Sequence, residues 1–129
     1  MNALLLDTHT WVWSLTGDRH LSDAATKVIR QADSVWVSPI SFFEIGQKVR
    51  IGKWPEMEAL VGDLSRLLEE QRGRIASITP EISLKAGIIA WEHRDPFDRM
   101  IASTALQASM PIVSADQIFD TLPGIKRIW

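Results

Sequence analysis

Four acidic side chains stand where an apolar, strand-like run ends or where a helix begins: Asp7, Glu44, Asp98 and Asp116. The carboxyl ends of parallel strands share one edge of a sheet, and ligands bind in the crevice beyond that edge. Two bare carboxylates about 5 Å apart repel by roughly 3 kcal/mol at an effective dielectric near 20. A shared pocket therefore needs a cation, and oxygen ligands in a chain without cysteine favour Mg²⁺ or Mn²⁺.

Three of these acids also have a structural interpretation when each is taken alone. Glu44 lies three residues after Ser41 and four before Lys48, so it fits a capping box or a surface ion pair. Asp116 suits the cap of a short helix that follows it. Asp7 is the hardest to explain in this way, because a charge that closes a fully apolar strand is costly to bury unpaired.

Asp98 falls in the first turn of a predicted helix, where a negative charge favours the positive end of the helix dipole. Asp95, followed by Pro96, is the better N-cap candidate, which leaves Asp98 free for another role. Arg99 is the nearest cation in sequence. Because adjacent helix residues point apart, we expect Arg99 to form a structural salt bridge with Asp95.

The ring-bearing side chains receive a different interpretation. An oxygen-rich site needs no nitrogen donor, so we place three histidines outside catalysis: His9, His20 and His93. Six tryptophans are many for a short chain, and we expect that Trp11, Trp13, Trp54 and Trp91 are not all buried in so small a core. Some of them then face a partner, either protein or unpaired bases.

Length and composition predict one domain that spans residues 1–129, with 46% hydrophobic residues to form a single core. The absence of cysteine excludes disulfides and zinc–thiolate sites. A net charge of −2 argues against a polybasic coat for nucleic acid. No leader and no membrane-length apolar run is evident, so a cytoplasmic protein without membrane contact is expected.

The predicted elements alternate between strand and helix. Apolar runs predict strands over 3–6, 35–37, 75–78, 111–113 and 125–129. A cap residue followed by proline at Ser38, Thr79 and Asp95 predicts three helix starts, the first helix reaching Ile51. Apolar residues at helical spacing from Met57 to Leu68 predict a further helix. The order favours a three-layer α/β/α sandwich around a mainly parallel sheet of four or five strands.

Four segments, in this order and at these intervals, carry a family resemblance: Asp7-Thr8-His9-Thr10-Trp11-Val12-Trp13; Ser38-Pro39-Ile40-Ser41-Phe42-Phe43-Glu44-Ile45 with Lys48 and Gly52-Lys53; His93-Arg94-Asp95-Pro96-Phe97-Asp98-Arg99-Met100-Ile101-Ala102; and Ser114-Ala115-Asp116. With them, the chain resembles a PIN-domain ribonuclease of the VapC toxin type over nearly its whole length.

The resemblance implies a Mg²⁺-dependent endoribonuclease, with Mn²⁺ able to substitute, that acts as the toxin of a toxin–antitoxin pair. It implies that the acids at the positions of Asp7, Glu44, Asp98 and Asp116 form the metal site and act in catalysis, and that the hydroxyls of Thr8 and Ser114 line it. RNA as substrate, a cognate antitoxin and a homodimer are the implied partners.

Other functions remain open at this point. A receiver domain also gathers aspartates, but it needs a phosphate-accepting Asp after its third strand, where this chain has Thr79-Pro80. A haloacid-dehalogenase-like phosphatase expects a second Asp two residues after the first, where this chain has His9. A DNA nuclease of the same fold and a non-catalytic module that binds RNA or protein are the closer alternatives.

Overall fold

The computed structural model describes residues 2–129, and its centre is a five-stranded sheet in the order β3-β2-β1-β4-β5. All four strand pairings are parallel. The strands are β1 (Ala3–Leu6), β2 (Ser34–Val37), β3 (Gly73–Ile75), β4 (Ile112–Val113) and β5 (Arg127–Ile128). The predicted parallel α/β sheet is confirmed.

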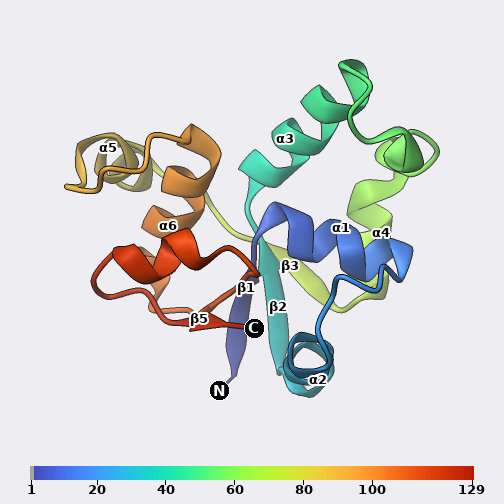
Figure 1. Ribbon diagram of the computed structural model, residues 1–129, viewed down its shortest axis with the longest axis horizontal. Coiled ribbons are helices and arrows are strands. Elements are labelled where there is room, and N and C mark those ends of the chain that lie inside the picture. The colour runs from blue at the N-terminus through green and yellow to red at the C-terminus, as the bar shows by residue number, and fades with distance from the viewer. Residues whose placement is uncertain (1) are drawn as a thin grey trace.

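Helices cover both faces of this sheet (Figure 1). They are α1 (Thr8–Thr16), α2 (Asp23–Gln31), α3 (Pro39–Arg50), α4 (Leu64–Glu70), α5 (Pro80–Ile88) and α6 (Pro96–Ala108), with short 3-10 turns η1 (Pro55–Met57), η2 (Val61–Asp63) and η3 (Gln117–Thr121). Within residues 2–129, no helix combines the length and the apolar character needed to cross a membrane.

Alternation along β1 divides the core into two parts, because successive strand side chains point to opposite faces. Leu4 and Leu6 pack against Trp11 of α1 and the neighbouring apolar residues of α2, α3 and α4. Leu5 packs on the other face, against Ile101 and its neighbours on α6. The two clusters give the chain its three layers.

Two predicted elements differ from the structure. The segment from Met57 to Leu68 is no continuous helix but two 3-10 turns followed by α4, with Gly62, a poor helix former, inside the second turn. The third strand lies at Gly73–Ile75 and not at 75–78. Arg72, with φ of 59°, makes the left-handed turn that ends α4, and Gly73 already belongs to the strand.

From β1 the chain adds β2 and then β3 on one side of the sheet, and it then returns to add β4 and β5 on the other side of β1. The strand order therefore reverses between β1 and β4. In open parallel sheets this switch point opens a crevice beyond the strand ends. Asp7 follows β1 and Ser114 follows β4. The backbone thereby delivers two of the predicted site residues to the same crevice.

Candidate metal centre

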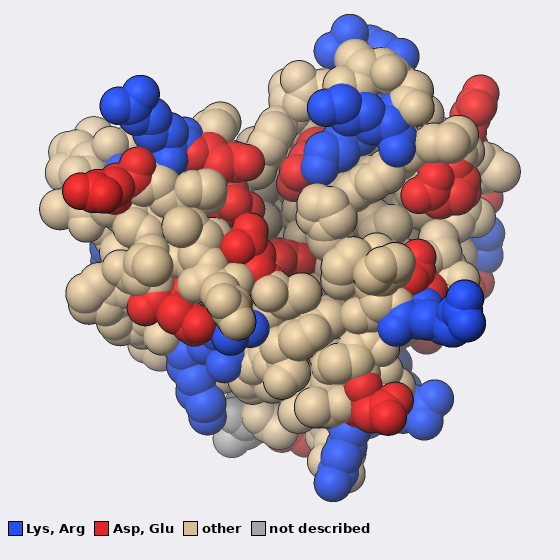
Figure 2. Space-filling view, viewed as in Figure 1, with Lys and Arg blue, Asp and Glu red and all other residues tan. Residues whose placement is uncertain are grey.

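A cleft of about 400 Å³ lies at this edge of the sheet. Figure 2 shows acidic side chains gathered along the hollow between the α5–α6 lobe and α3. The residues that line the cleft come from the ends of β1 and β4 and from α1, α3 and the start of α6: Asp7, Thr8, His9, Trp13, Glu44, Lys48, Asp95, Asp98, Ala115 and Asp116. The four acids singled out in the sequence therefore share one cleft.

Asp7 is buried and serves as the N-cap of α1, since its Oδ1 accepts a hydrogen bond from the Thr10 backbone N–H at 2.8 Å. The Ser114 hydroxyl donates to its other oxygen, Oδ2. Burial raises the pKa of Asp7, and the hydrogen bonds from Ser114 and Thr10 oppose that rise. Within residues 2–129, the local structure thus holds this carboxylate in place without a lysine or arginine partner.

Ser114 joins the ends of the two central strands. Its Oγ, which donates to Asp7, also accepts the Asp116 backbone N–H at 3.0 Å. The Thr10 hydroxyl donates to the Val113 carbonyl at 2.8 Å and ties α1 to the end of β4. Asp116 itself is exposed and caps η3 through a 3.0 Å hydrogen bond from the Ile118 N–H, as its structural interpretation predicted.

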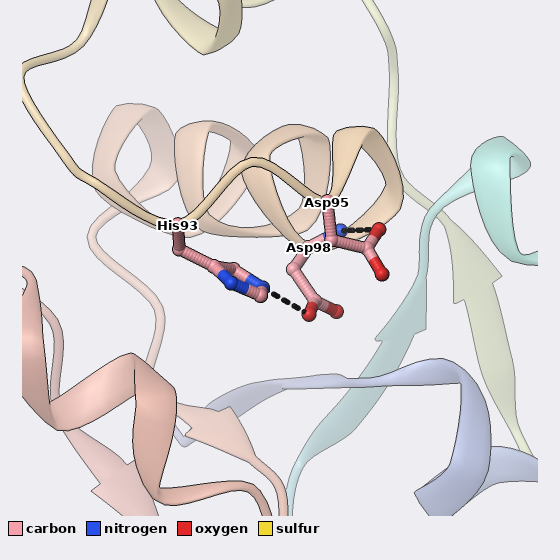
Figure 3. A group of neighbouring side chains, drawn as sticks. All are labelled: His93, Asp95 and Asp98. Carbon is pink, nitrogen blue, oxygen red and sulfur yellow. Dashed lines mark hydrogen bonds and ion pairs between the residues drawn. The ribbon is translucent and has the colours of Figure 1, made fainter.

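Asp98 lies on the first turn of α6, and Asp95 caps that helix by accepting hydrogen bonds from the Phe97 and Asp98 N–H groups. Figure 3 shows the His93 ring directed at the Asp98 carboxylate, where Nε2 lies 2.7 Å from Oδ2. Burial raises the pKa of Asp98 to about 6; the charges of Asp95 and Asp7 add to the rise, and the hydrogen bond from His93 opposes it.

Glu44 on α3 is buried at the side of the cleft and pairs with Lys48 one turn later, Nζ to Oε2 at 3.0 Å. The capping-box alternative for Glu44 is wrong, because α3 begins at Pro39 with Ser38 as its cap. Ser41 instead shares a 2.8 Å hydrogen bond with the Thr8 hydroxyl across α1 and α3.

The predicted salt bridge between Arg99 and Asp95 is wrong. Arg99 donates to backbone carbonyls of the α5–α6 connection, and Asp95 is occupied with capping α6. His93, which we placed outside the site, contacts Asp98 directly. Its ligand atom and those of Asp95 and Asp98 lie within 4.8 Å of one another. The only sequence signal for this contact was the five-residue spacing between His93 and Asp98.

An aromatic wall flanks the acids on the α1 side. The exposed His9 ring lies 5.1 Å from the Trp54 ring and 5.7 Å from the Trp13 ring, centroid to centroid. Lys48 Nζ lies 4.4 Å from the centre of the Trp54 ring. Trp11 is fully buried, whereas Trp13, Trp54 and Trp91 are only partly buried, as the size of the core predicted.

The charges of the cleft fit a hard divalent cation. Among the described residues, neither Asp7 nor Asp116 forms a salt bridge with lysine or arginine, and the only ionic partner of Asp98 is His93. Lys48, the one lysine or arginine among the lining residues, already pairs with Glu44. Carboxylate and hydroxyl oxygens supply the ligand type that Mg²⁺ prefers.

The chain resembles known proteins over nearly its whole length. Residues 4–125 match the model of the PIN domain. The chain is 29% identical to Ribonuclease VapC22 of Mycobacterium tuberculosis (strain ATCC 25618 / H37Rv) over 119 residues, which cover 91% of this chain and 89% of that protein.

Solved structures show the same fold at low sequence identity. VapBC2 from Rickettsia felis, bound to a DNA fragment from its promoter, superposes with a TM-score of 0.66 at 17% identity, over 97% of this chain and 96% of that one. A toxin–antitoxin complex from Klebsiella pneumoniae gives 0.63 at 15% identity, over 95% and 94%. The match along residues 4–125 shows that the chain belongs to the PIN-domain family.

Proposed function

We propose that this single domain is a Mg²⁺-dependent endoribonuclease and the toxin of a toxin–antitoxin pair. The observation that carries the proposal is the meeting of Asp7, Glu44, Asp98 and Asp116 in one cleft, three of them without a lysine or arginine partner among residues 2–129. The similarity to Ribonuclease VapC22 and the shared fold with toxin–antitoxin proteins support RNA as the substrate and an antitoxin as the partner.

The residues divide into groups that hold the cation and groups that orient water. Asp7 and Asp98 would bind the principal ion, and Asp116, exposed at the rim, would complete its shell directly or through water. Glu44 would orient the attacking water or help to hold a second ion. A Mg²⁺ or Mn²⁺ ion held by these residues would supply activation of water and charge neutralisation at the phosphate and the leaving oxygen.

Two hydroxyl groups belong to the surroundings of Asp7. Ser114 fixes one oxygen of Asp7, and Thr8, which lines the cleft beside Asp7, is oriented by its hydrogen bond to Ser41. Thr8 lines the cleft, whereas Ser114 is buried behind Asp7 and is not among the lining residues. We assign Thr8 and Ser114 to substrate binding.

Cleavage assays with purified protein test the proposal. Wild type, Asp7→Asn and Asp98→Asn are incubated with a structured RNA and with DNA of the same sequence, each in Mg²⁺ and in EDTA. Asp23→Asn, an exposed first-turn acid on α2, is the matched control. We expect Mg²⁺-dependent cutting of RNA by wild type and control, and large losses in both site variants.

Each other outcome identifies a different function. Wild-type rates in both site variants refute the metal assignment. Cutting of DNA in place of RNA indicates a DNA nuclease, and bound metal without any cutting indicates a binding module. Co-purification with the product of a short neighbouring reading frame, and relief of growth arrest by that product, test the antitoxin partner.

The proposed homodimer has a physical basis in exposed apolar side chains. Leu84 and Ile88 of α5 are 65% and 72% exposed, and Phe43 of α3 is 62% exposed. Leu84 and Ile88 lie one turn apart on α5, and exposed apolar groups of this kind favour burial against a partner. Light scattering is expected to give twice the monomer mass of 14.5 kDa, and a monomer at all concentrations contradicts the dimer.

A further inference from the structure

The Arg99 guanidinium donates hydrogen bonds to the end of α5 and to the segment that connects α5 to α6. A guanidinium carries five N–H groups in a planar fork, and here all of them have carbonyl partners. Nε donates at 2.7 Å, Nη1 twice at 2.8 Å, and Nη2 at 2.6 and 3.4 Å. In chain order the acceptors are the carbonyls of Ala86, Gly87, Ile89, Trp91 and His93.

Two of these carbonyls belong to the last turn of α5, where helical C=O groups lack partners within the helix and carry partial negative charge. Arg99 therefore closes the end of α5 and fixes the path of the following residues at once. A lysine offers three donors from a single atom and cannot reproduce this fork. The contact thus depends on arginine in particular.

His93 is held at three points, one on its backbone and two on its ring. Arg99 Nη1 binds its backbone carbonyl at 2.8 Å. The Trp91 ring packs beside the imidazole at 5.0 Å between centroids, and the Trp91 indole N–H is itself fixed by the Thr121 hydroxyl at 2.7 Å. The free end of the ring, Nε2, meets Asp98 Oδ2 at 2.7 Å (Figure 3).

This hydrogen bond has a defined direction when Asp98 is ionised. A carboxylate only accepts, so Nε2 of His93 must carry the proton and donate it. One oxygen of Asp98 is then tied to His93, and the other is left for a cation in the cleft. Partners of this kind orient ligating carboxylates and tune metal affinity.

We propose that Arg99 and His93 form one positioning unit, in which Arg99 holds the α5–α6 connection so that His93 fixes the Asp98 carboxylate for the divalent cation. The inference rests on the proposed function, because it assigns Asp98 to the metal site. Neither residue touches the substrate. Both act through Asp98, which is the neighbour of Arg99 in sequence at the start of α6.

Mn²⁺ titration calorimetry on the purified full chain tests this unit, independently of RNA cleavage. We expect His93→Ala to weaken Mn²⁺ binding about 10- to 100-fold and His93→Gln, whose amide also donates, to restore most of the affinity. Arg99→Lys should weaken binding to a similar extent. The double variant His93→Ala/Arg99→Lys should bind Mn²⁺ with about the same affinity as whichever single variant binds it less tightly, because both changes break the same chain of contacts.

His20→Ala is the matched control, since His20 also contacts an aspartate, Asp18, at 2.6 Å but lies outside the cleft lining. Melting curves in EDTA verify that each variant is folded at the titration temperature. Wild-type affinity in His93→Ala overturns the inference, and so does failure of His93→Gln to recover binding. If the losses of Mn²⁺ affinity add in the double variant, Arg99 does not act through His93, and the proposed unit is wrong. A wild-type chain that binds no Mn²⁺ overturns the proposed function itself.

Discussion

Replacing Asp98 with asparagine is expected to stabilise the metal-free protein and to remove its stabilisation by Mn²⁺. The ionised carboxylate is held in the folded state beside Asp95 and Asp7 and is largely withdrawn from water. Asparagine has nearly the same shape and can still accept a hydrogen bond from His93. The substitution therefore removes the charge and leaves the local packing in place.

The size of the effect follows from the pKa of Asp98. A rise from 3.8 to about 6 corresponds to roughly 3 kcal/mol once the group is fully ionised. Its side chain is 22% exposed, so solvent screening is modest. The dipole of α6 favours the charge by about 0.3–1 kcal/mol, which leaves a net gain of roughly 2 kcal/mol for Asp98→Asn.

The direction of the pKa shift of Asp98 also determines how the stability difference depends on pH. Because the folded-state pKa lies above the unfolded value, the stability of wild type relative to Asp98→Asn is greatest below about pH 4 and falls as the pH rises through about 6. The advantage of the variant should therefore be larger at pH 8 than at pH 4.5. With Mn²⁺ at 100 times its Kd, wild type gains about 2.7 kcal/mol and the order of stability reverses.

Urea denaturation in EDTA and in Mn²⁺, at both pH values, measures these differences. Asp23→Asn, the exposed first-turn acid on α2, should change stability by less than about 0.5 kcal/mol and show no response specific to Mn²⁺. A wild type that is more stable than Asp98→Asn in EDTA at pH 8 would refute the reasoning that burial and the neighbouring acids make the ionised Asp98 destabilising.

Three further outcomes are expected. At limiting Mg²⁺, the rate of RNA cleavage should fall as the pH drops through about 6, because protons compete with the metal at Asp98. Excess Mg²⁺ should move the midpoint of this pH profile to lower pH. A midpoint that does not depend on the Mg²⁺ concentration contradicts this expectation. Ser114→Ala should lower the free energy of unfolding in EDTA by about 1–3 kcal/mol, because Asp7 loses a buried donor and the Asp116 N–H loses its acceptor; an unchanged urea midpoint argues against it. Trp11→Ala, at a fully buried site, should cost about 3–5 kcal/mol by the same measurement, and a loss below about 1 kcal/mol is inconsistent with its place in the core.

Three helix starts were predicted correctly because their chemistry is local. Ser38, Thr79 and Asp95 each cap a helix whose first residue is proline, as the sequence indicated. A cap needs only a short polar side chain and the next three backbone N–H groups. Nothing distant in the chain is required, so the sequence alone is sufficient.

The third strand was misplaced because tertiary packing decided its position. Ile75 is 50% exposed, so the apolar character of the segment was a poor guide. Gly73, the first residue of β3, lies against Leu68 so closely that an added Cβ would lie 2.2 Å from the Leu68 side chain. The close approach of α4 to the sheet edge explains that glycine, and no local pattern reveals it.

The site shows the same division between local and tertiary information. Asp7, Asp98 and Asp116 were singled out by residue type and by position at element ends, and the fold brings them to one cleft. Glu44 reaches the same cleft from the middle of α3, so the expectation that it lies where a helix begins was wrong. The roles of His93 and Arg99 could not be predicted in this way. Their contacts depend on the irregular path between α5 and α6, where no periodic pattern applies.

Anomalous diffraction from crystals grown in saturating Mn²⁺ tests the central claim most directly. We predict a strong peak in the cleft, within coordination distance of carboxylate oxygens from Asp7 and Asp98 and facing Asp116. A cleft without a peak, or Mn²⁺ bound only elsewhere on the surface, would contradict the claim that these acids form a metal site.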